Sequence, residues 1–552
     1  MNKNSIKSRL IWGFIFIAFI LTVANADEKT DKVDKLFARW DSTVSPGAAL
    51  AIIKDGKIIY KRGYGMANLE HNIPITPTSV FRIGSTSKQI TAACIAILAL
   101  EGKISLDDDI RKYIPELPRY ERTITVRHLV HHTSGIRDYL TLEEIAGKTD
   151  DQFYTPEDSI ELLARQKKLN FLPGDYHLYS NSGYFLMGVI VARVSGKTLN
   201  DFAHEHIFKP LGMKNTHFHD DHTMIIKGRA DGYSPTESGY QIDMTTLDHV
   251  GDGGIFTTVE DLFLWDQAFY NNKLGKELTE LIQTPGVLDN GKKLTYAFGL
   301  DIDEYKGLKG VSHSGGFAGF RSVHIRFPEQ DFSTICFANL STIGPYKLCM
   351  KIVEIYLADE FKGVEKKPKK KIEPITVSKK ELEEKAGNYR DQKSREWFII
   401  SVKDDKLELE VWGQKVELLP VSKTRFESSG GEFDAYIEFL PDPKKANLTV
   451  EQREKIDLVK APKLKPLTPS QLKVYAGEYY NDELPATYKL AVENGKLFFK
   501  HKNAPKKPLR AMAQDMFTVR WLDIEFTRNK KKRITGMIVG AGRAANIEFV
   551  KK

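Results

Sequence analysis

The sequence predicts an α/β domain built around a β-sheet, followed by two small antiparallel β units that are similar to each other. Two observations lead to this prediction. Strand-like segments lie near both ends of residues 27–362 with helical segments between them, so one sheet would be assembled from distant parts of the chain. Beyond residue 377 the pattern changes to short alternating strands, and it recurs at a spacing of about 90 residues.

The elements of the first domain follow from local signals. Residues 48–53 and 58–64 are β-rich and are separated by Asp55-Gly56, a pair that favours a hairpin turn. A long helix is expected from near Ser85 to Gly102. Another should begin at Thr257 or Thr258, because an acid follows each of them three residues later. The other expected elements are helices over 32–40 and 346–361 and strands over 297–305, 319–327 and 332–340.

The C-terminal part of the chain is expected to hold a linker and two repeated units. Residues 363–377 are rich in Lys and Pro and are predicted to be the linker. The units are expected at 378–462 and 466–552, and each has the length of a small antiparallel, lipocalin-like barrel. The repeat is visible in Ala386-Gly387-Asn388-Tyr389, which matches Ala476-Gly477-Glu478-Tyr479. Neither unit carries an obvious catalytic cluster.

The first 26 residues are predicted to be a signal peptide. Lys3, Lys7 and Arg9 precede an uncharged run over residues 10–23, and Ala24-Asn25-Ala26 supplies the small residues that a signal peptidase reads. The uncharged run is shorter than the ~20 apolar residues that a membrane span requires. We therefore expect a periplasmic or secreted protein that keeps no stable membrane anchor after cleavage.

Composition is that of a globular protein, with 41% hydrophobic and 28% charged residues among 552. The formal net charge is +8, and basic runs stand at 366–371 and 530–533. Such runs fit either a solvated linker or turn, or loose attraction to anionic polymers of the cell envelope. The sequence shows no basic groove interleaved with aromatic residues, so no nucleic-acid partner is expected.

Cysteine and histidine usage predicts neither a disulfide framework nor a metal site. Cys94, Cys336 and Cys349 are sparse and odd in number, and a bridge between the last two stays open. Three histidines at 128, 131 and 132 are expected to be structural, and a denser group over residues 217–222 is expected to be a polar loop rather than a zinc site. No cofactor is expected.

A candidate nucleophile stands where a loop enters the helix near residue 85. Ser85 and Lys88 are three residues apart, so they share one helical face. A helix N-terminus also offers free N–H groups that favour an oxyanion. A serine hydroxyl needs a base, and a lysine serves as one only when its pKa falls from about 10.4 toward roughly 7–8. Taken alone, the pattern also fits an ordinary capped helix.

Two further elements supply what this pair lacks. Tyr179 and Asn181 precede an apolar helix, where a phenol can exchange a proton and an amide can bind both a lysine and a substrate carbonyl. His313-Ser314-Gly315-Gly316 combines an imidazole with glycines that let a strand edge approach a substrate closely. A backbone N–H there is a candidate second oxyanion donor beside that of Ser85.

The order and spacing of these three elements resemble the serine β-lactamase and penicillin-binding protein superfamily, most of all its class C β-lactamase, DD-peptidase and D-aminopeptidase branch. Supporting matches are residues 128–135 and 253–258. The resemblance covers residues 30–362 and implies an antiparallel sheet flanked by helices plus an all-helical subdomain. The paired β units are also similar to the double barrel of D-aminopeptidases.

The resemblance also implies roles for these residues. Ser85 would form the acyl-enzyme, and Lys88 and Tyr179 would share proton transfer, with the identity of the base left open. Asn181 would orient Lys88 and the substrate amide. The pocket residues implied for substrate binding are Asn181, His313, Ser314, Gly315 and Gly316, with the N–H groups of Ser85 and Gly316 as the oxyanion hole.

One departure bears on the substrate. Many β-lactamases carry Lys-Thr-Gly where this chain has His313-Ser314-Gly315. A histidine, with a pKa of about 6.5, is mostly neutral at pH 7 and is a weaker anchor for a penicillin carboxylate. The leading expectation is therefore a peptidase or amidase for substrates with D-residues. A carboxylesterase, a β-lactamase and a non-catalytic envelope-binding protein are the alternatives. The substrate and the oligomeric state stay open.

Overall fold

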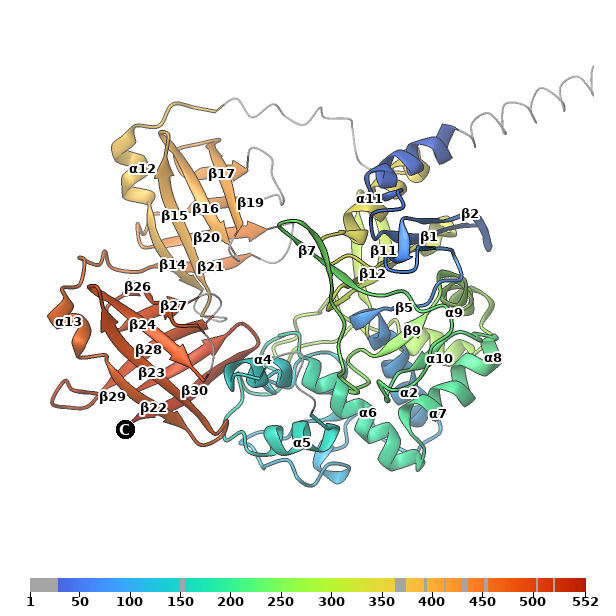
Figure 1. Cartoon of the computed structure of the whole chain (residues 1–552), viewed down its shortest axis with the longest axis horizontal. Helices are drawn as coiled ribbons and strands as arrows, with labels where there is room; N and C mark the ends of the chain where they lie inside the picture. The colour runs from blue at the N-terminus through green and yellow to red at the C-terminus, as the bar shows by residue number, and fades with distance from the viewer. Residues whose placement is uncertain are drawn as a thin grey trace, which may run out of the picture. The chain divides into compact units, whose positions relative to one another are not determined.

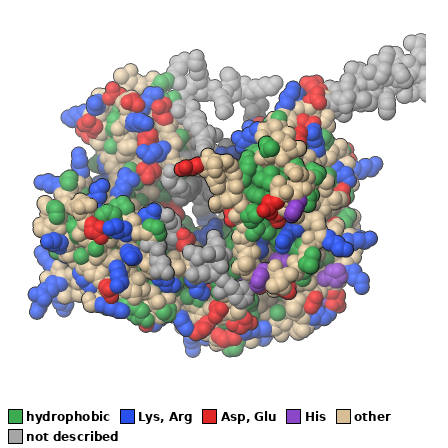
Figure 2. All heavy atoms as spheres, viewed as in Figure 1, with side chains coloured by type: hydrophobic (Ala, Val, Ile, Leu, Met, Phe, Trp, Pro, Cys, Tyr) green, Lys and Arg blue, Asp and Glu red, His purple; other side chains and the backbone are tan. Residues whose placement is uncertain are grey.

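The computed structural model describes residues 28–148, 154–362, 374–391, 395–411, 414–428, 435–450, 455–502, 505–519 and 522–552. The predicted signal peptide and residues 363–373 of the predicted linker lie outside them. The described chain forms two compact units (Figure 1). Unit 1 holds residues 28–135, 154–160 and 171–362; unit 2 holds 136–148, 161–170 and everything from 374 onward. Charged side chains are spread over the visible surface of both units (Figure 2).

Unit 1 is built on a six-stranded antiparallel sheet, which confirms the sheet expected from distant segments. In this sheet β1 pairs on one side with β2 and on the other with β13, so Leu50 lies opposite Cys336. The strand order is β10 (Asp301–Tyr305), β11 (Leu308–Phe317), β12 (Phe320–Phe327), β13 (Phe332–Ala338), β1 (Ala48–Lys54) and β2 (Lys57–Tyr64).

The alternation of residues along β12 explains the two layers that cover the sheet. Val323, Ile325 and Phe327 join an apolar core with residues of the 28–37 helix and of α11 (Pro345–Leu357). On the opposite face, Ser322 donates a hydrogen bond to the Ile83 carbonyl, and His324 pairs with Asp266 of α9 (Val259–Asn271). The polar face of this strand therefore points toward the segment that carries Ser85.

Local signals set where the helices and strands of unit 1 begin. Thr258 caps α9 by accepting a hydrogen bond from the Asp261 N–H at 3.0 Å, one of the two predicted caps. The strand expected over 297–305 begins only at Asp301, because Ala297 N–H bonds back to the Leu300 carbonyl and Gly299 has a φ of +71°.

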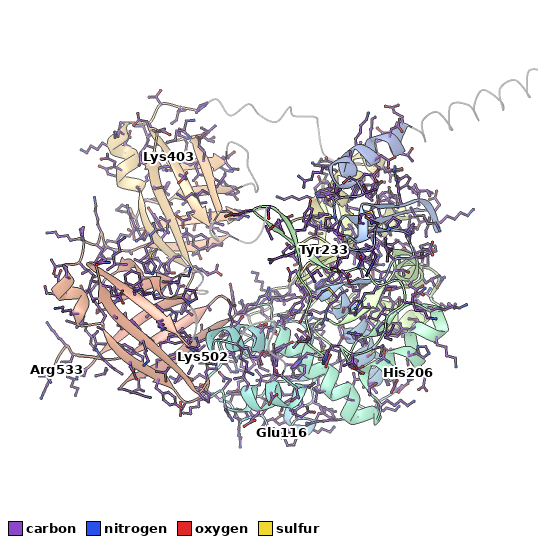
Figure 3. All side chains as sticks on the ribbon, viewed as in Figure 1. Glu116, His206, Tyr233, Lys403, Lys502 and Arg533 are labelled. Carbon is purple, nitrogen blue, oxygen red and sulfur yellow. The ribbon has the colours of Figure 1, made fainter. Side chains whose placement is uncertain are left out.

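Unit 1 also contains the helices η1 (Ala38–Trp40), η2 (Gly84–Ser87), α2 (Lys88–Leu100), η3 (Ile110–Lys112), α3 (Val126–Val130), α6 (Asn181–Ser195), α7 (Leu199–Ala203), η4 (His204–Phe208), α8 (Lys209–Leu211), α10 (Lys276–Leu281) and η5 (Pro328–Gln330). The helix α5 (Pro156–Ala164) begins in unit 1 and ends in unit 2. The short strands of unit 1 are β3 (Met66–Asn68), β4 (Ile73–Pro74), β5 (Phe81–Arg82), β6 (His217–Phe218), β7 (Tyr233–Thr236), β8 (Gly239–Ile242) and β9 (Ile255–Thr257). Figure 3 labels Tyr233 at the start of β7.

Unit 2 contains the two expected barrels. The first is a closed barrel that follows α12 (Lys379–Lys385), and its strands are β14 (Gly387–Asp391), β15 (Trp397–Lys403), β16 (Lys406–Val411), β17 (Gln414–Pro420), β18 (Arg425–Ser428), β19 (Ala435–Phe439), β20 (Lys445–Val450) and β21 (Ile456–Lys460). Its core is formed by alternate residues such as Leu407, Leu409 and Val411, as a half-buried strand requires.

The second barrel is a nine-stranded sheet whose two end strands, β25 and β26, are consecutive in the chain. It follows α13 (Pro469–Lys473). Its strands are β22 (Gly477–Asn481), β23 (Ala486–Glu493), β24 (Lys496–His501), β25 (Lys507–Pro508), β26 (Arg510–Ala513), β27 (Met516–Val519), β28 (Leu522–Arg528), β29 (Ile534–Ala541) and β30 (Ala544–Lys551). The two β units are thus a closed and a nearly closed barrel, as predicted.

The repeat between the barrels extends to individual hydrogen bonds. Each barrel begins with a short helix whose N-terminus is closed by a capping box, formed by Ser378 in one and Thr468 in the other. The buried Tyr389 and Tyr479 each donate a hydrogen bond to the carbonyl four residues earlier, at 2.7 and 2.8 Å. These equivalences explain why the sequence match around Gly387 and Gly477 recurs.

Unit 2 also takes in residues 136–148 and 161–170, which include α4 (Tyr139–Ile145). Arg137 lies fully buried and fixes these segments to the second barrel. Its guanidinium pairs with Glu483 at 2.9 Å and donates to the carbonyls of Ala545 and Asn546. A fourth acceptor for it is the Gln166 side chain at 2.8 Å.

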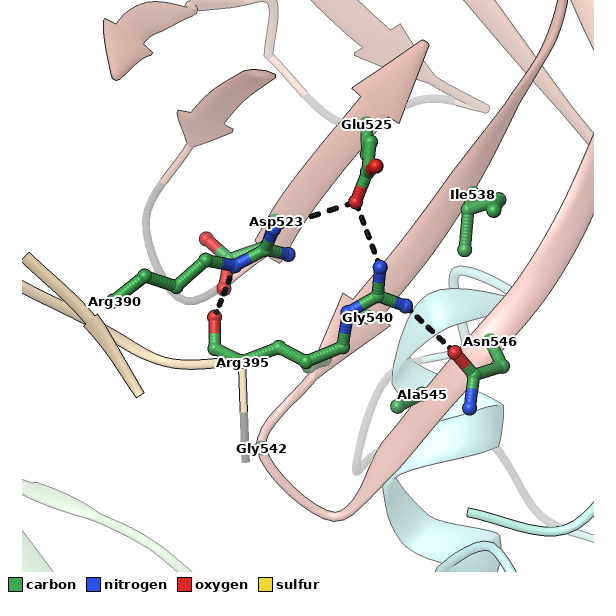
Figure 4. Close-up of a pocket in the computed structure, with 10 residues that line it drawn as sticks. Arg390, Arg395, Asp523, Glu525, Ile538, Gly540, Gly542, Ala545 and Asn546 are labelled. Atoms are coloured by element: carbon green, nitrogen blue, oxygen red, sulfur yellow. Dashed lines mark hydrogen bonds and ion pairs between the residues drawn. The ribbon is translucent and has the colours of Figure 1, made fainter. Parts of the chain in front are cut away.

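Charged residues also join the two barrels to each other (Figure 4). Arg395, which follows the first barrel's opening strand, pairs with Glu525 at 2.7 Å and donates to the Asn546 side chain at 2.6 Å. Arg390 pairs with the same Glu525 at 3.3 Å. These residues line a pocket at the junction of the barrels. Asp523 also lines it, and burial raises the pKa of this carboxyl to about 7. The junction is therefore polar rather than a continuation of either apolar core.

The three cysteines are free and buried. Cys336 lies on β13 and Cys349 on α11, and a hydrogen bond between the two thiols together with burial holds the pKa of Cys336 well above its usual range. No helix in the described ranges combines the length and apolar character that a bilayer span requires.

The buried Arg137–Glu483 pair should dominate the attachment of residues 136–148 to the second barrel. Glu483→Gln removes the carboxylate charge and leaves the guanidinium buried, so we expect the free energy of unfolding to fall by about 3 kcal/mol in urea titrations followed by circular dichroism. The control is Glu478→Gln, whose partner Lys489 is 64% exposed. That change should be worth less than about 1 kcal/mol. Equal losses in the two variants would contradict this account.

Candidate active site

Ser85 lies in a turn that glycine makes possible. It occupies η2, one residue after Gly84, which has a φ of +49°. A Cβ on Gly84 would stand 2.9 Å from the Gly316 nitrogen, so only glycine allows β11 to approach this closely. The α-helix α2 begins at Lys88 rather than at Ser85, and the serine therefore sits on a tight 3₁₀ turn before it. The predicted entry of a loop into a helix is present at this point.

Lys88 is fully buried, and its ammonium group has three acceptors. Its Nζ lies 3.1 Å from Ser85 Oγ and 2.9 Å from Asn181 Oδ1. It also donates to the backbone carbonyl of Asp252. A buried amine is tolerated only when its N–H groups are satisfied, and three acceptors match the three donors of an ammonium. Three distant chain segments therefore meet at one nitrogen atom.

Tyr179 and Asn181 reach this nitrogen from the N-terminus of α6. The ring centroid of Tyr179 lies 4.8 Å from Lys88 Nζ. The ring of His132 packs against the Tyr179 ring at 4.3 Å, and its Nδ1 accepts a hydrogen bond from the Ser180 N–H at 3.1 Å. His132 itself has a φ of 56°, an unusual conformation for a residue other than glycine. It thus positions the segment that carries the phenol and the amide.

His313 projects from β11 into the same cluster of rings. Its ring centroid lies 6.2 Å from that of Tyr179. Its Nδ1 is 2.7 Å from the Ser314 carbonyl, which only accepts, so this nitrogen carries the proton. Its Nε2 is 3.1 Å from the Tyr296 hydroxyl and therefore accepts. Burial and the nearby charge of Lys88 lower the pKa of His313 to about 3, so the ring is neutral at pH 7.

The glycines after His313 bring β11 against the turn that carries Ser85. A Cβ on Gly315 would lie 2.1 Å from the Ile83 carbonyl and 2.9 Å from the Ser85 nitrogen. Strand alternation places Ser314 and Gly316 on the other face, where both are exposed. The Gly316 nitrogen thus lies close to Gly84, the residue before Ser85.

One edge of β11 has no partner strand beside these residues in the part of the chain that the structure describes. β10 pairs with β11 only over Leu308–Ser312, and in the described chain no strand covers that edge from His313 to Phe317. On its other side β11 pairs continuously with β12, from Val311 to Phe317. An exposed strand edge is a template for an extended peptide backbone. The edge starts at the imidazole and runs past Gly315 and Gly316.

The structure brings Lys88, Tyr179, Asn181 and His313 together beside Ser85, whereas the side chain of Ser314 lies on the other, exposed face of β11. It also adds three contacts that the sequence did not reveal. These are the Asp252 carbonyl, which binds Lys88, Tyr296, which binds His313, and His132 as the support of Tyr179. A backbone acceptor has no residue signature, although Asp252 directly precedes the matched Gly253-Gly254. Nothing in the sequence near Tyr296 signals its contact with a residue seventeen positions away.

The histidines at 217, 219 and 222 contact each other or a carboxylate. His217 and His219 lie 3.4 Å apart through their ring nitrogens, and His222 pairs with Asp248 at 2.7 Å. His217 belongs to β6 rather than to a loop. Within the ranges that the structure describes, no group of three or more His, Cys, Asp or Glu residues is placed to hold a metal ion.

The chain is similar to several known proteins. The Beta-lactamase family model matches residues 33–348. The chain is 26% identical to a D-aminopeptidase of Brucella anthropi, over 91% of this chain and 95% of that protein. It is 29% identical to penicillin-binding protein 4* of Bacillus subtilis, over 69% and 87%. The octameric penicillin-binding protein homologue of Pyrococcus abyssi superposes with a TM-score of 0.55 at 26% identity, over 79% of this chain and 99% of that one. The chain belongs to the Beta-lactamase family and is a serine hydrolase.

Proposed function

We propose that this protein is an exported amidase or peptidase that forms an acyl-enzyme on Ser85 and acts on substrates with D-amino acid residues. The observation that carries the proposal is the contact of Lys88 Nζ with Ser85 Oγ, Asn181 Oδ1 and the Asp252 carbonyl. The substrate class is supported by the names of similar proteins, which include several D-aminopeptidases. Export is supported by the pattern of the first 26 residues.

The contacts of Lys88 suit a base as well as an ammonium ion. A neutral amine has two N–H groups and one lone pair. With its two N–H groups on Asn181 and Asp252, the lone pair would face the Ser85 hydroxyl and take its proton as the oxygen attacks the substrate carbonyl. Tyr179, whose ring lies against Nζ, is the alternative base, and the leaving amine would recover the proton from either group.

The polarity of the pocket favours a substrate without a carboxylate next to the scissile bond. His313 is neutral, and both of its ring nitrogens are engaged by Ser314 and Tyr296. It therefore offers no positive charge at the position where many family members carry a lysine. A neutral amide or ester suits such a pocket better than a penicillin. The open edge of β11 would hold the substrate backbone by hydrogen bonds. A carboxylesterase acting on small acyl esters is the second candidate, because the same groups serve it.

Removal of the nucleophile or of its buried amine should abolish the chemistry. We expect Ser85→Ala to lose labelling by a fluorophosphonate probe and to lower kcat/KM for D-alanine p-nitroanilide by about 10⁴-fold or more. Lys88→Met should lower it by at least about 10³-fold, because the hydroxyl loses its activating neighbour. Lys103→Met, on an exposed side chain after α2, is the control and should behave as wild type.

A purified wild-type protein that resists the probe, beside a known serine hydrolase that reacts, would end this proposal. Turnover of the L-alanine anilide as fast as the D-alanine anilide would keep the mechanism and reject the D-specific substrate. Preference for a nitrophenyl ester over both anilides would favour the carboxylesterase.

The pH profile should carry no contribution from His313. Its folded pKa is lowered to about 3, so the imidazole stays deprotonated throughout the range from pH 5 to 8. The acid limb of kcat/KM for the D-alanine anilide should therefore lie at the same pH in wild type and in His313→Gln, even if the plateau falls. A shift of that limb by half a pH unit or more in the variant would show that the imidazole titrates during turnover.

A positive charge at residue 313 should change which substrates are preferred. We expect His313→Lys to raise kcat/KM for a chromogenic cephalosporin relative to that for the D-alanine anilide by about tenfold, because an ion pair to the carboxylate is worth about 1.5–3 kcal/mol when partly buried. His313→Gln, which adds no charge, is the matched control and should leave the ratio unchanged. Fast cephalosporin turnover by the wild type would contradict the proposed substrate class.

A further inference from the structure

The positive charge of the chain is concentrated in the second barrel. Residues 466–552 hold 17 lysines and arginines against eight aspartates and glutamates, a net formal charge of +9. The whole chain carries +8, so the preceding 465 residues sum to −1. The space-filling view shows Lys and Arg side chains along the margin of this barrel (Figure 2). A local excess of this size attracts polyanions.

The first barrel shows that the fold does not need this charge. Residues 378–462 hold 16 basic and 18 acidic residues, a net charge of −2, in a similar antiparallel barrel. The clearest difference is one hairpin turn. Between β28 and β29 the chain reads Asn529-Lys530-Lys531-Lys532-Arg533, whereas the equivalent turn between β19 and β20 holds Leu440-Pro441-Asp442-Pro443-Lys444.

This basic turn is ordered by its own hydrogen bonds. Asn529 exchanges backbone hydrogen bonds with Arg533 and Lys532, and its side chain accepts from the N–H groups of Lys531 and Arg533 at 3.0 and 3.1 Å. Lys532 has a φ of 58°, where glycine or asparagine is usual. The Arg533 side chain extends away from the barrel (Figure 3). Four cations are therefore held on a defined turn despite their mutual repulsion.

Other basic side chains meet this turn at helix α13. Arg528 donates to the Lys532 carbonyl and pairs with Asp515, which accepts a hydrogen bond from Tyr475 just after α13. Lys551 donates to the Val474 carbonyl at 3.0 Å. Lys473 ends α13 and is exposed. We call Lys473, Lys530, Lys531, Lys532, Arg533 and Lys551 the basic cluster. Among the ion pairs between described residues, none involves the four cations of the turn.

We propose that the basic cluster of the second barrel binds a flexible, phosphate-bearing linear polymer, separately from the hydrolytic site. Six cations on one end of a barrel match a chain that carries one negative charge per repeat. Lysine ammonium groups pair with phosphates as point charges and demand no fixed geometry. A linear polymer, unlike a single anion, can contact the turn, α13 and the end of β30 at once. Such a surface would hold the enzyme where anionic polymers are abundant.

Inorganic polyphosphate of about 100 residues is the probe, with the full-length protein and fluorescence anisotropy as the readout. We expect binding whose logarithmic affinity falls linearly with the logarithm of salt concentration. The test variant is Lys530→Gln, Lys531→Gln, Lys532→Asn and Arg533→Gln, where Asn suits the left-handed position 532. It should weaken binding at least tenfold at 50 mM salt and reduce the salt slope by about 3, since four phosphate contacts are lost.

The matched control removes four charges from the first barrel by Lys403, Lys423, Lys444 and Lys445→Gln. It should bind within twofold of wild type, and both variants should hydrolyse the D-alanine anilide at the wild-type rate. Equal weakening in the two variants would reduce the effect to net charge and overturn the proposal. So would a wild type that prefers vesicles of phosphatidylglycerol to the soluble polymer, or that binds neutral dextran equally well.

Discussion

The buried amine of Lys88 is the constraint on which the rest of unit 1 depends. An ammonium or amine group without water must find acceptors in the protein, and this one finds them in a helical turn, in the start of α6 and in the loop before β9. Those three segments can meet only if α2 and α6 pack together and the loop over 251–254 crosses between them. Thr91 of α2 fixes that loop through the Gly251 carbonyl at 2.7 Å. The geometry around Ser85 therefore depends on the same packing that forms the helical core of unit 1.

Much of the active site could be predicted from the sequence, because its chemistry requires particular side chains at several positions. The spacing of Ser85 and Lys88 places both at a helix N-terminus, and the structure has both there. The order of strands at the two ends of the domain predicted the central sheet. What stayed hidden depends on groups common to all residues or on distant partners. The Asp252 carbonyl is the first kind, and Tyr296 on His313 is the second.

The two barrels show how one scaffold carries different surfaces. Capping boxes, buried tyrosines and first strands recur in both, because each unit curls a similar antiparallel sheet around an apolar core. Their exposed turns do not contribute to that core and can differ. The first barrel is mildly acidic, and the second is strongly basic. Their junction is held by Arg390 and Arg395 on Glu525, which fixes the pair as one unit despite the difference in charge. The buried residues maintain the shared fold, and the exposed residues, which differ between the barrels, carry the proposed polymer binding.

The contacts of Arg137 affect the order in which parts of the chain can fold during synthesis. It leaves the ribosome 346 residues before its partner Glu483, and the carbonyls that also receive it come later still. Domains usually fold in order of synthesis, but unit 2 cannot be completed until its last strands exist. Residues 136–148 must therefore wait for most of translation before Arg137 can reach Glu483 and the two carbonyls. Truncated products that lack the last strands would leave this helical segment without the partners that bury Arg137.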